Sequence, residues 1–149
     1  MTKKKSKKRS ASNNAAPPDS PILFIDRCAW SHRLGEALTQ LGAPFIPHHE
    51  QFAPDCPDEE WLETAGKQGW IVLTRDKNIR RKPNELRAFR DHKVIGFVFT
   101  SGDASAADTA ALVTAVYPKL IRKAKGTKPP AMFSVTLAGA INPIKLQVN

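Results

Sequence analysis

Short apolar runs alternate with helical repeats from residue 21 onward. The run 22–25 is continuous and rich in β-favouring residues, which predicts a strand buried on both faces. From Leu34 to Leu41 apolar residues recur at i, i+3, i+4 and i+7, the spacing of one helix face. Gly42 follows where a helix C-cap belongs. The pattern therefore predicts a strand followed by a helix.

The same alternation continues in the middle of the chain. A short strand at 45–46 is expected to end in a polar loop at 48–50. A second helix is expected to begin at Asp58, because three acids fill its first turn and favour the positive end of a helix dipole. The run 70–73 then predicts a third strand that continues into Thr74.

The last part of the chain carries further elements of both kinds. We expect a helix at 84–92 near Pro83, a strand at 94–99, a helix capped by Ser105, and strands at 132–137 and 144–148 joined by a turn. Pro118 is expected to kink or break the helix that Ser105 caps. Strands alternating with helices predict a three-layer α/β domain with a mainly parallel central sheet. The last two strands are candidates for an antiparallel pair at one edge.

Length and composition limit the organisation of the protein. The 149 residues suffice for one domain, expected at 21–149, and a tail at 1–20. No run approaches the ~20 continuous apolar residues of a membrane helix, and residues 10–18 are too polar for a signal peptide. A soluble, cytoplasmic protein is expected. Cys28 and Cys56 are too few for a zinc site or a disulfide scaffold, so both are interpreted as small packing residues.

The positive charge is concentrated at the N-terminus. Six basic residues and one acid lie in residues 1–20, which therefore carry more than half of the net charge of +9. Because this segment has almost no large apolar residues, we expect a disordered basic arm. Such an arm attracts phosphates in a salt-dependent manner, and a solubilising leader is an equally good interpretation.

Three aspartates are placed where a parallel α/β sheet binds its ligands, beyond the carboxyl ends of the strands. Asp26 ends the first strand, and Asp76 lies two residues past the last apolar residue of the third. Asp58 opens the helix that precedes the third strand, so it is expected at the same edge. Closely spaced carboxylates repel one another unless a cation offsets their charge. Oxygen ligands without His or Cys favour Mg²⁺ or Mn²⁺, which suit hydrolysis of a phosphodiester.

The segment from Asp58 to Asp76 resembles the second half of a PIN domain. In that family a helix-opening Asp is followed 18 residues later by the Asp of a Thr-x-Asp signature, matched here by Thr74 and Asp76. Residues 22–26 are similar to the first strand of the family and its leading Asp26. The resemblance spans residues 21–100 and is closest to compact VapC-type proteins. It implies a Mg²⁺- or Mn²⁺-dependent ribonuclease, commonly the toxin of a toxin–antitoxin pair and often a homodimer.

The chain departs from the larger members of the family in two ways. Only sixteen residues lie between Leu41 and Asp58, so the helices that carry a further acid are missing. The candidates for a fourth metal ligand are, in order, Glu59, Glu50 and Glu36. Asn78 stands two residues after Asp76, where the family often has an acid; its amide oxygen is a candidate to contact a metal or to orient a water.

Basic residues follow the third strand directly and are candidates for RNA contact. A basic strip that borders the acidic site is suited to hold the phosphates that flank a scissile bond, and a solvated loop is the alternative interpretation. The candidates are Lys77, Arg80, Arg81, Lys82 and Arg27. Thr74 is a candidate to hydrogen-bond a carboxylate or a metal-bound water.

We therefore interpret the chain as a metal-dependent endoribonuclease in which Asp26, Asp58 and Asp76 are the catalytic and metal-binding residues. RNA is the expected substrate and an antitoxin a candidate partner. The alternative is a catalytically inactive PIN-like module that binds RNA or regulates another protein, suggested by the missing acid and by Asn78. A receiver-like role for Asp26 as phospho-acceptor fits poorly, because no acidic pair accompanies it.

Overall fold

The computed structural model describes residues 20–76, 78–101 and 103–146. The predicted basic arm lies outside the described residues, apart from Ser20. The elements in chain order are β1 (Leu23–Ile25), α1 (His32–Leu41), β2 (Phe45–Pro47), α2 (His48–Gln51), α3 (Asp58–Gln68), β3 (Ile71–Thr74), the 3₁₀ turn η1 (Ile79–Arg81), α4 (Pro83–Asp91), β4 (Ile95–Phe99), α5 (Ala106–Lys125), β5 (Ala131–Val135) and β6 (Ile141–Ile144).

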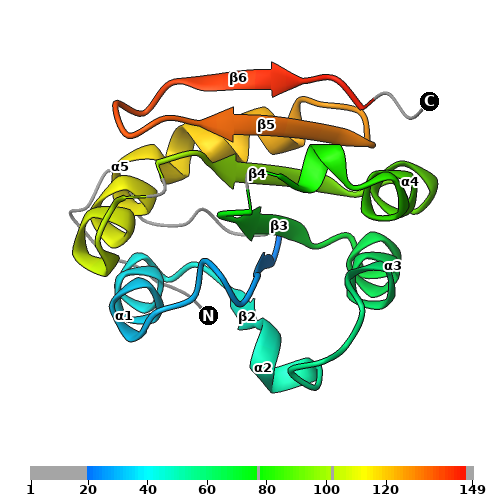
Figure 1. Cartoon of the computed structure of the whole chain (residues 1–149). Coiled ribbons are helices and arrows are strands. Elements are labelled where there is room, and N and C mark those ends of the chain that lie inside the picture. Colours follow the sequence, from blue (N-terminus) through cyan, green and yellow to red (C-terminus); the bar gives the residue numbers. More distant parts are fainter. Residues whose placement is uncertain (1–19, 77, 102, 147–149) are drawn as a thin grey trace, which may run out of the picture.

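The six strands form one sheet in the order β2-β1-β3-β4-β5-β6 (Figure 1). The pairs from β2 to β5 are parallel, and β6 pairs with β5 in the antiparallel direction. From β1 the chain first adds β2 on one side and then adds β3 on the other. The strand order therefore reverses between β1 and β3, which is the point of an open α/β sheet where ligands bind.

The helices cover the sheet in two layers, as Figure 1 shows, with α1 and α5 on one face and α3 and α4 on the other. One buried cluster lies under α1 and α5, and a second lies under α3 and α4. In the second cluster Phe24 of β1 stacks between Trp61 of α3 and Trp70, at centroid distances of 5.2 and 5.4 Å. Burial of these rings holds α3, and with it Asp58, against β1.

The fold class predicted from the sequence is confirmed: the domain is α/β, mainly parallel, with an antiparallel pair at one edge. The helix ends follow the expected local chemistry. Gly42 ends α1 in the left-handed conformation at φ 72°, which favours a residue without Cβ. Ser105 caps α5 in a reciprocal capping box with Asp108. Among the described residues, no helix is both long and apolar enough to cross a bilayer.

Two local predictions were wrong, and a third was wrong in part. The expected polar loop at 48–50 is the short helix α2, and His48 is buried in it. The break expected at Pro118 does not occur, because helix α5 continues through it and the buried residues around it pack against the core. The last strand is 141–144 rather than 144–148; Pro143 stands inside it because an edge strand tolerates a residue without an N–H donor. Residues 147–149 lie outside the described part.

Candidate active site

Asp26 lies at the carboxyl end of β1 and is 9% exposed. Its backbone N–H donates to the Leu73 carbonyl at 2.9 Å, which continues the pairing of β1 with β3 past the last strand residue. Oδ1 accepts from the Arg27 backbone N–H at 2.7 Å, and Oδ2 accepts from the Thr74 hydroxyl at 2.7 Å. A carboxylate this well buried needs such donors, because burial without them costs several kcal/mol. Asp26 is therefore held in one orientation from both strands.

Thr74 is the last residue of β3 and is 1% exposed. Its hydroxyl donates to Asp26 and accepts a hydrogen bond of 3.1 Å from the Asp76 backbone N–H. One hydroxyl thus fixes the carboxylate at the end of β1 and the backbone turn that presents Asp76. The structure places Thr74 in the carboxylate-binding position that the sequence suggested.

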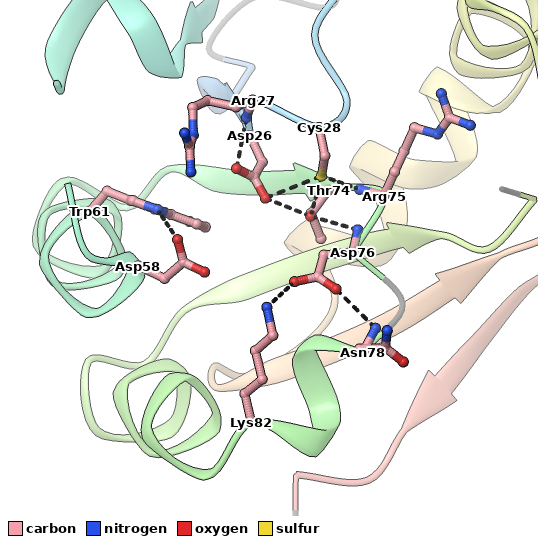
Figure 2. A network of polar contacts seen from close by, with 10 residues as sticks. All are labelled: Asp26, Arg27, Cys28, Asp58, Trp61, Thr74, Arg75, Asp76, Asn78 and Lys82. Atoms are coloured by element: carbon pink, nitrogen blue, oxygen red, sulfur yellow. Dashed lines mark hydrogen bonds and ion pairs between the residues drawn. The ribbon is translucent and has the colours of Figure 1, made fainter. Parts of the chain in front are cut away.

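Asp76 lies two residues beyond the end of β3, and two neighbouring groups contact its carboxylate (Figure 2). Oδ1 accepts from the Asn78 backbone N–H at 3.1 Å, and Oδ2 lies 2.7 Å from Nζ of Lys82. The hydrogen bond to Asp76 raises the pKa of Lys82 above its ordinary value. Lys82, predicted as an RNA contact, therefore pairs with Asp76 inside the site. Asn78 contacts Asp76 through its backbone, while its side chain is exposed.

Asp58 is the first residue of α3, where the helix dipole favours a carboxylate. Its Oδ1 accepts a hydrogen bond of 3.0 Å from the indole N–H of Trp61, one helical turn further on. Since Trp61 is fully buried, this bond ties the carboxylate to the aromatic cluster under α3. Asp58 is thus oriented by its own helix.

The three aspartates line one pocket of about 490 Å³ at the switch point of the sheet, together with Arg27, Cys28 and Lys82. Figure 2 shows the carboxylates of Asp26 and Asp76 with that of Asp58 opposite them. The sequence placed these acids at one edge, and the structure brings them from β1, α3 and the turn after β3 into this pocket.

The donors of the pocket suit a hard divalent cation, because carboxylate oxygens are the ligands that Mg²⁺ and Mn²⁺ prefer. Within the described ranges, no three His, Cys, Asp or Glu side chains form a group that could hold one ion. Instead, Asp76 is paired with Lys82 and Asp58 with Trp61. The chemistry of the donor set therefore fits a metal, but its ligands are not assembled around a common point.

The structure does not bring the predicted fourth acid to this pocket, and none of the three candidates lines it. Glu59 is exposed, because it lies about 100° around α3 from Asp58, whose side chain enters the pocket. Glu50 is exposed on α2, and Glu36 is exposed on α1 beside Trp30. The described part of the pocket contains three carboxylates, and a fourth ligand stays a prediction.

The other basic residues differ in where they lie. Arg27 lines the pocket, and Arg81 is exposed on η1 outside it. Lys77 and the side chain of Arg80 lie outside the described part of the chain. Arg75, which the sequence did not single out, donates to the Ser101 and Ala104 carbonyls at 3.3 and 3.1 Å and so fixes the loop before α5.

Cys28 was interpreted as a packing residue, and this was wrong. The residue is exposed and lines the acidic pocket. Its Sγ lies 3.4 Å from Asp26 Oδ2 and 3.3 Å from the Thr74 hydroxyl, and accepts from the Arg75 backbone N–H at 3.3 Å. Burial of the sulfur, and then the charge of Asp26, raise the pKa of the thiol. The sequence did contain a signal for this position, because Cys28 follows Asp26, which ends a strand, by two residues.

Comparisons with known proteins show the family of this domain. The family model described as "PIN like domain" matches residues 21–101, and the chain belongs to this PIN-like family. A protein of Mycobacterium tuberculosis named "Putative ribonuclease VapC45" is 26% identical over 115 residues, which cover 74% of this chain and 83% of that protein. No solved structure matches the chain. The resemblance drawn from the Asp58 to Asp76 segment is therefore confirmed.

Proposed function

We propose that the protein is a VapC-type endoribonuclease that hydrolyses RNA phosphodiester bonds with the help of Mg²⁺ or Mn²⁺. One observation carries the proposal: three aspartates from three separate elements line one pocket at the switch point of the sheet. Membership of the PIN-like family and the similarity to a protein named as a ribonuclease support it.

In this proposal Asp26, Asp58 and Asp76 hold the cation and Thr74 keeps the first of them in place. A bound divalent cation lowers the pKa of water and offsets the charge of a phosphate. Asp26 is already oriented by three neighbouring donors, the Arg27 N–H, the Thr74 hydroxyl and the Cys28 thiol. Asp76, which is paired with Lys82, would hold the cation once the Lys82 side chain, 44% exposed, has moved away.

Two basic side chains of the pocket have a role in binding the substrate. With a cation at Asp76, the ammonium group of Lys82 would be available to contact a phosphate oxygen. Arg27 offers a second positive charge on the β1 side of the pocket. Positive charge on both sides of the carboxylates positions the RNA backbone for attack, while the bases are recognised elsewhere.

The partners follow from the same proposal. RNA is the substrate, an antitoxin that covers the pocket is the partner that a VapC-type toxin needs, and pairing with a second copy of the chain is expected. The cytoplasm is the expected place of action.

A second candidate function has one specific observation in its favour. The described part of the pocket has three carboxylates, and one of them is already neutralised by Lys82 at 2.7 Å. A module with this arrangement binds RNA phosphates without cutting them. The two candidates differ in their dependence on metal.

The test is cleavage of labelled single-stranded RNA by the purified full chain with Mg²⁺ or Mn²⁺. We expect cleavage with either ion, none with a chelator, and a loss of at least about 100-fold in Asp76→Asn. Asp91→Asn is the matched control, because Asp91 is exposed at the far end of α4.

Each outcome separates the candidates. Cleavage by the native chain and by Asp91→Asn, but not by Asp76→Asn, supports the nuclease. Bound but intact RNA under both metals favours the non-catalytic module. Cleavage that persists in Asp76→Asn contradicts the assignment of the site.

A further inference from the structure

A second concave surface lies beside the acidic pocket, on the face of the sheet that α3 and α4 cover only in part. This groove, of about 820 Å³, runs between η1 and strands β4, β5 and β6. Its volume is within the range of ~300–1,000 Å³ that ligand sites occupy. The strands β5 and β6 lie at the outer edge of the sheet in Figure 1. The groove therefore exists because the antiparallel strand β6 extends the sheet past the helical layer.

The groove adjoins the acidic pocket, and a hydrogen bond connects a lining residue of each. Asn78 lines the groove, and its backbone N–H donates to Oδ1 of Asp76. Figure 2 shows Asn78 on one side of the Asp76 carboxylate and Lys82 on the other. A polymer bound across Asp76 therefore has a direct path into the groove.

The charge of the groove favours an anionic ligand. Arg81 on η1 and Lys145 just after β6 both line it, and both residues are exposed. None of the described residues that line it is acidic. Two cations on opposite walls, in a lining whose described residues include no acid, are suited to the phosphates of a nucleic-acid backbone.

The lining of the groove is part apolar and part polar. Val98, Met132 and Ile144 are its apolar part, and the last two are register partners on β5 and β6. Ser134, on the same face of β5 as Met132, and Asn78 add a hydroxyl and an amide. A flat aromatic base with polar edges matches this surface, because its faces bury apolar area while its edges form hydrogen bonds.

We propose that this groove binds one unpaired base of a single-stranded RNA, next to the nucleotide whose phosphate lies at Asp76. Arg81 and Lys145 contact the phosphates on either side of that base. The inference rests on the proposed function and names the form of RNA that the site accepts. A double helix is excluded, because its bases stay stacked and cannot enter a groove between η1 and a sheet edge. No aromatic ring lines the described groove, so the base is held by aliphatic contacts and hydrogen bonds to the polar lining rather than by stacking.

The experiment measures binding of short fluorescent RNAs to the full chain by anisotropy, in a chelator so that no RNA is cut. In the double variant Arg81→Ala/Lys145→Ala, two phosphate contacts are lost. We expect the negative slope of log K against log salt to become shallower by about 1.4. The affinity in low salt is expected to fall by about tenfold. The double variant Lys67→Ala/Arg90→Ala is the matched control, because it removes the same charge from exposed helix positions outside the groove.

A set of RNAs with one base removed at each position in turn tests the base site. Removal of the base at one position is expected to weaken binding about fivefold or more in the native chain, because the apolar area of that base is no longer buried. The same loss is expected to disappear in Ile144→Ser, which removes some of the apolar part of the lining. Circular dichroism and thermal unfolding check that the variants fold, and the exposed positions of Arg81 and Lys145 keep the first test independent of the core.

The outcomes distinguish this inference from the function on which it rests. If the native chain cleaves RNA with Mg²⁺ but the groove variants bind it as tightly as the native chain, the inference is wrong and the proposed function stands. The same result is expected if the groove binds a peptide instead. If the native chain neither binds nor cleaves RNA, the proposed function fails, and this inference fails with it.

Discussion

The hydroxyl of Thr74 donates a hydrogen bond of 2.7 Å to Oδ2 of Asp26, joining residues that are 48 positions apart in the chain. The two residues end neighbouring parallel strands, on either side of the point where the strand order reverses. The bond therefore crosses the switch point, and the second contact of Thr74, to the Asp76 backbone, connects both aspartates to it. The geometry of the site depends on this one buried hydroxyl.

Replacing Thr74 with Val is expected to lower both stability and RNA cleavage. Val keeps the shape and the β preference of Thr but leaves a buried carboxylate oxygen with one donor fewer. A hydrogen bond to a charged group contributes about 1.5–3 kcal/mol, so chemical denaturation should show a loss of this size. Cleavage should fall further than stability explains, because Asp26 and Asp76 lose their common partner.

Thr114→Val is the control for this prediction. The Thr114 hydroxyl donates to a carbonyl of its own helix, outside the site, so the free energy of unfolding should change by less than about 0.5 kcal/mol. Equal effects of the two variants on cleavage would show that Thr74 has no special place in the site.

Replacing Lys82 with Met is expected to strengthen metal binding. Lys82 competes with a cation for Asp76, and its side chain is 44% exposed, so the gain is modest. An exposed ion pair is worth up to about 1 kcal/mol, which corresponds to metal binding up to about fivefold tighter. Calorimetric titration with Mn²⁺ measures this change in affinity.

Lys67→Met breaks an exposed pair with Glu63 on α3 and is the matched control. Unchanged or weaker Mn²⁺ binding in Lys82→Met would mean that the ammonium and the cation do not compete for Asp76.

His48 is expected to make stability sensitive to acid. The residue is 1% exposed among Phe24, Phe52 and Trp61, and neither ring nitrogen has a hydrogen-bond partner within the described structure. Burial, and then the charge of Arg27, lower its pKa below the ordinary 6.5, although Asp26 and Asp58 act in the opposite direction.

The sign of the effect follows from the unfolded chain, which binds a proton on this ring near pH 6.5, whereas the folded chain does so only at lower pH. The stabilising contribution is therefore complete above about pH 6.5 and is lost as the pH falls below it, by at most about 1.4 kcal/mol per pH unit. Between pH 7.5 and pH 5.5, the free energy of unfolding measured by denaturation should decrease less for His48→Phe than for the native chain. The exposed His32→Gln should behave like the native chain, and an identical pH response of all three proteins would contradict the role of His48.

Removal of residues 1–18 is expected to weaken RNA binding mainly at low salt. This segment carries six of the basic residues of the chain, and contacts with phosphates release counterions, so their contribution falls as salt rises. Binding isotherms from 50 to 300 mM salt test it. Unchanged affinity at the lowest salt would identify the segment as a solubilising leader.

Much of the fold could be predicted because it depends on local patterns. The apolar spacing before Gly42 and the acids at Asp58 mark a helix end and a helix start through contacts within a few residues. The helix break expected at Pro118 does not occur, because local propensity is weaker than packing of a long amphipathic helix against the core. The shift of the last strand has a similar cause, since its register depends on pairing with β5 and not on its own residues.

The candidate site also has features that follow from local sequence and features that depend on packing. The sequence by itself determined which carboxylates stand at strand and helix ends, because those positions follow from the order of elements and from the family pattern of Asp58, Thr74 and Asp76. Only the tertiary structure decided that Lys82 forms an ion pair with Asp76 and that Cys28 lines the pocket. It also decided that the three acids line this pocket without forming a metal-binding group among the described residues. The reason is physical: spacing along a chain fixes the face and the edge of an element, whereas a contact across elements depends on how their side chains share space and charge once they are packed.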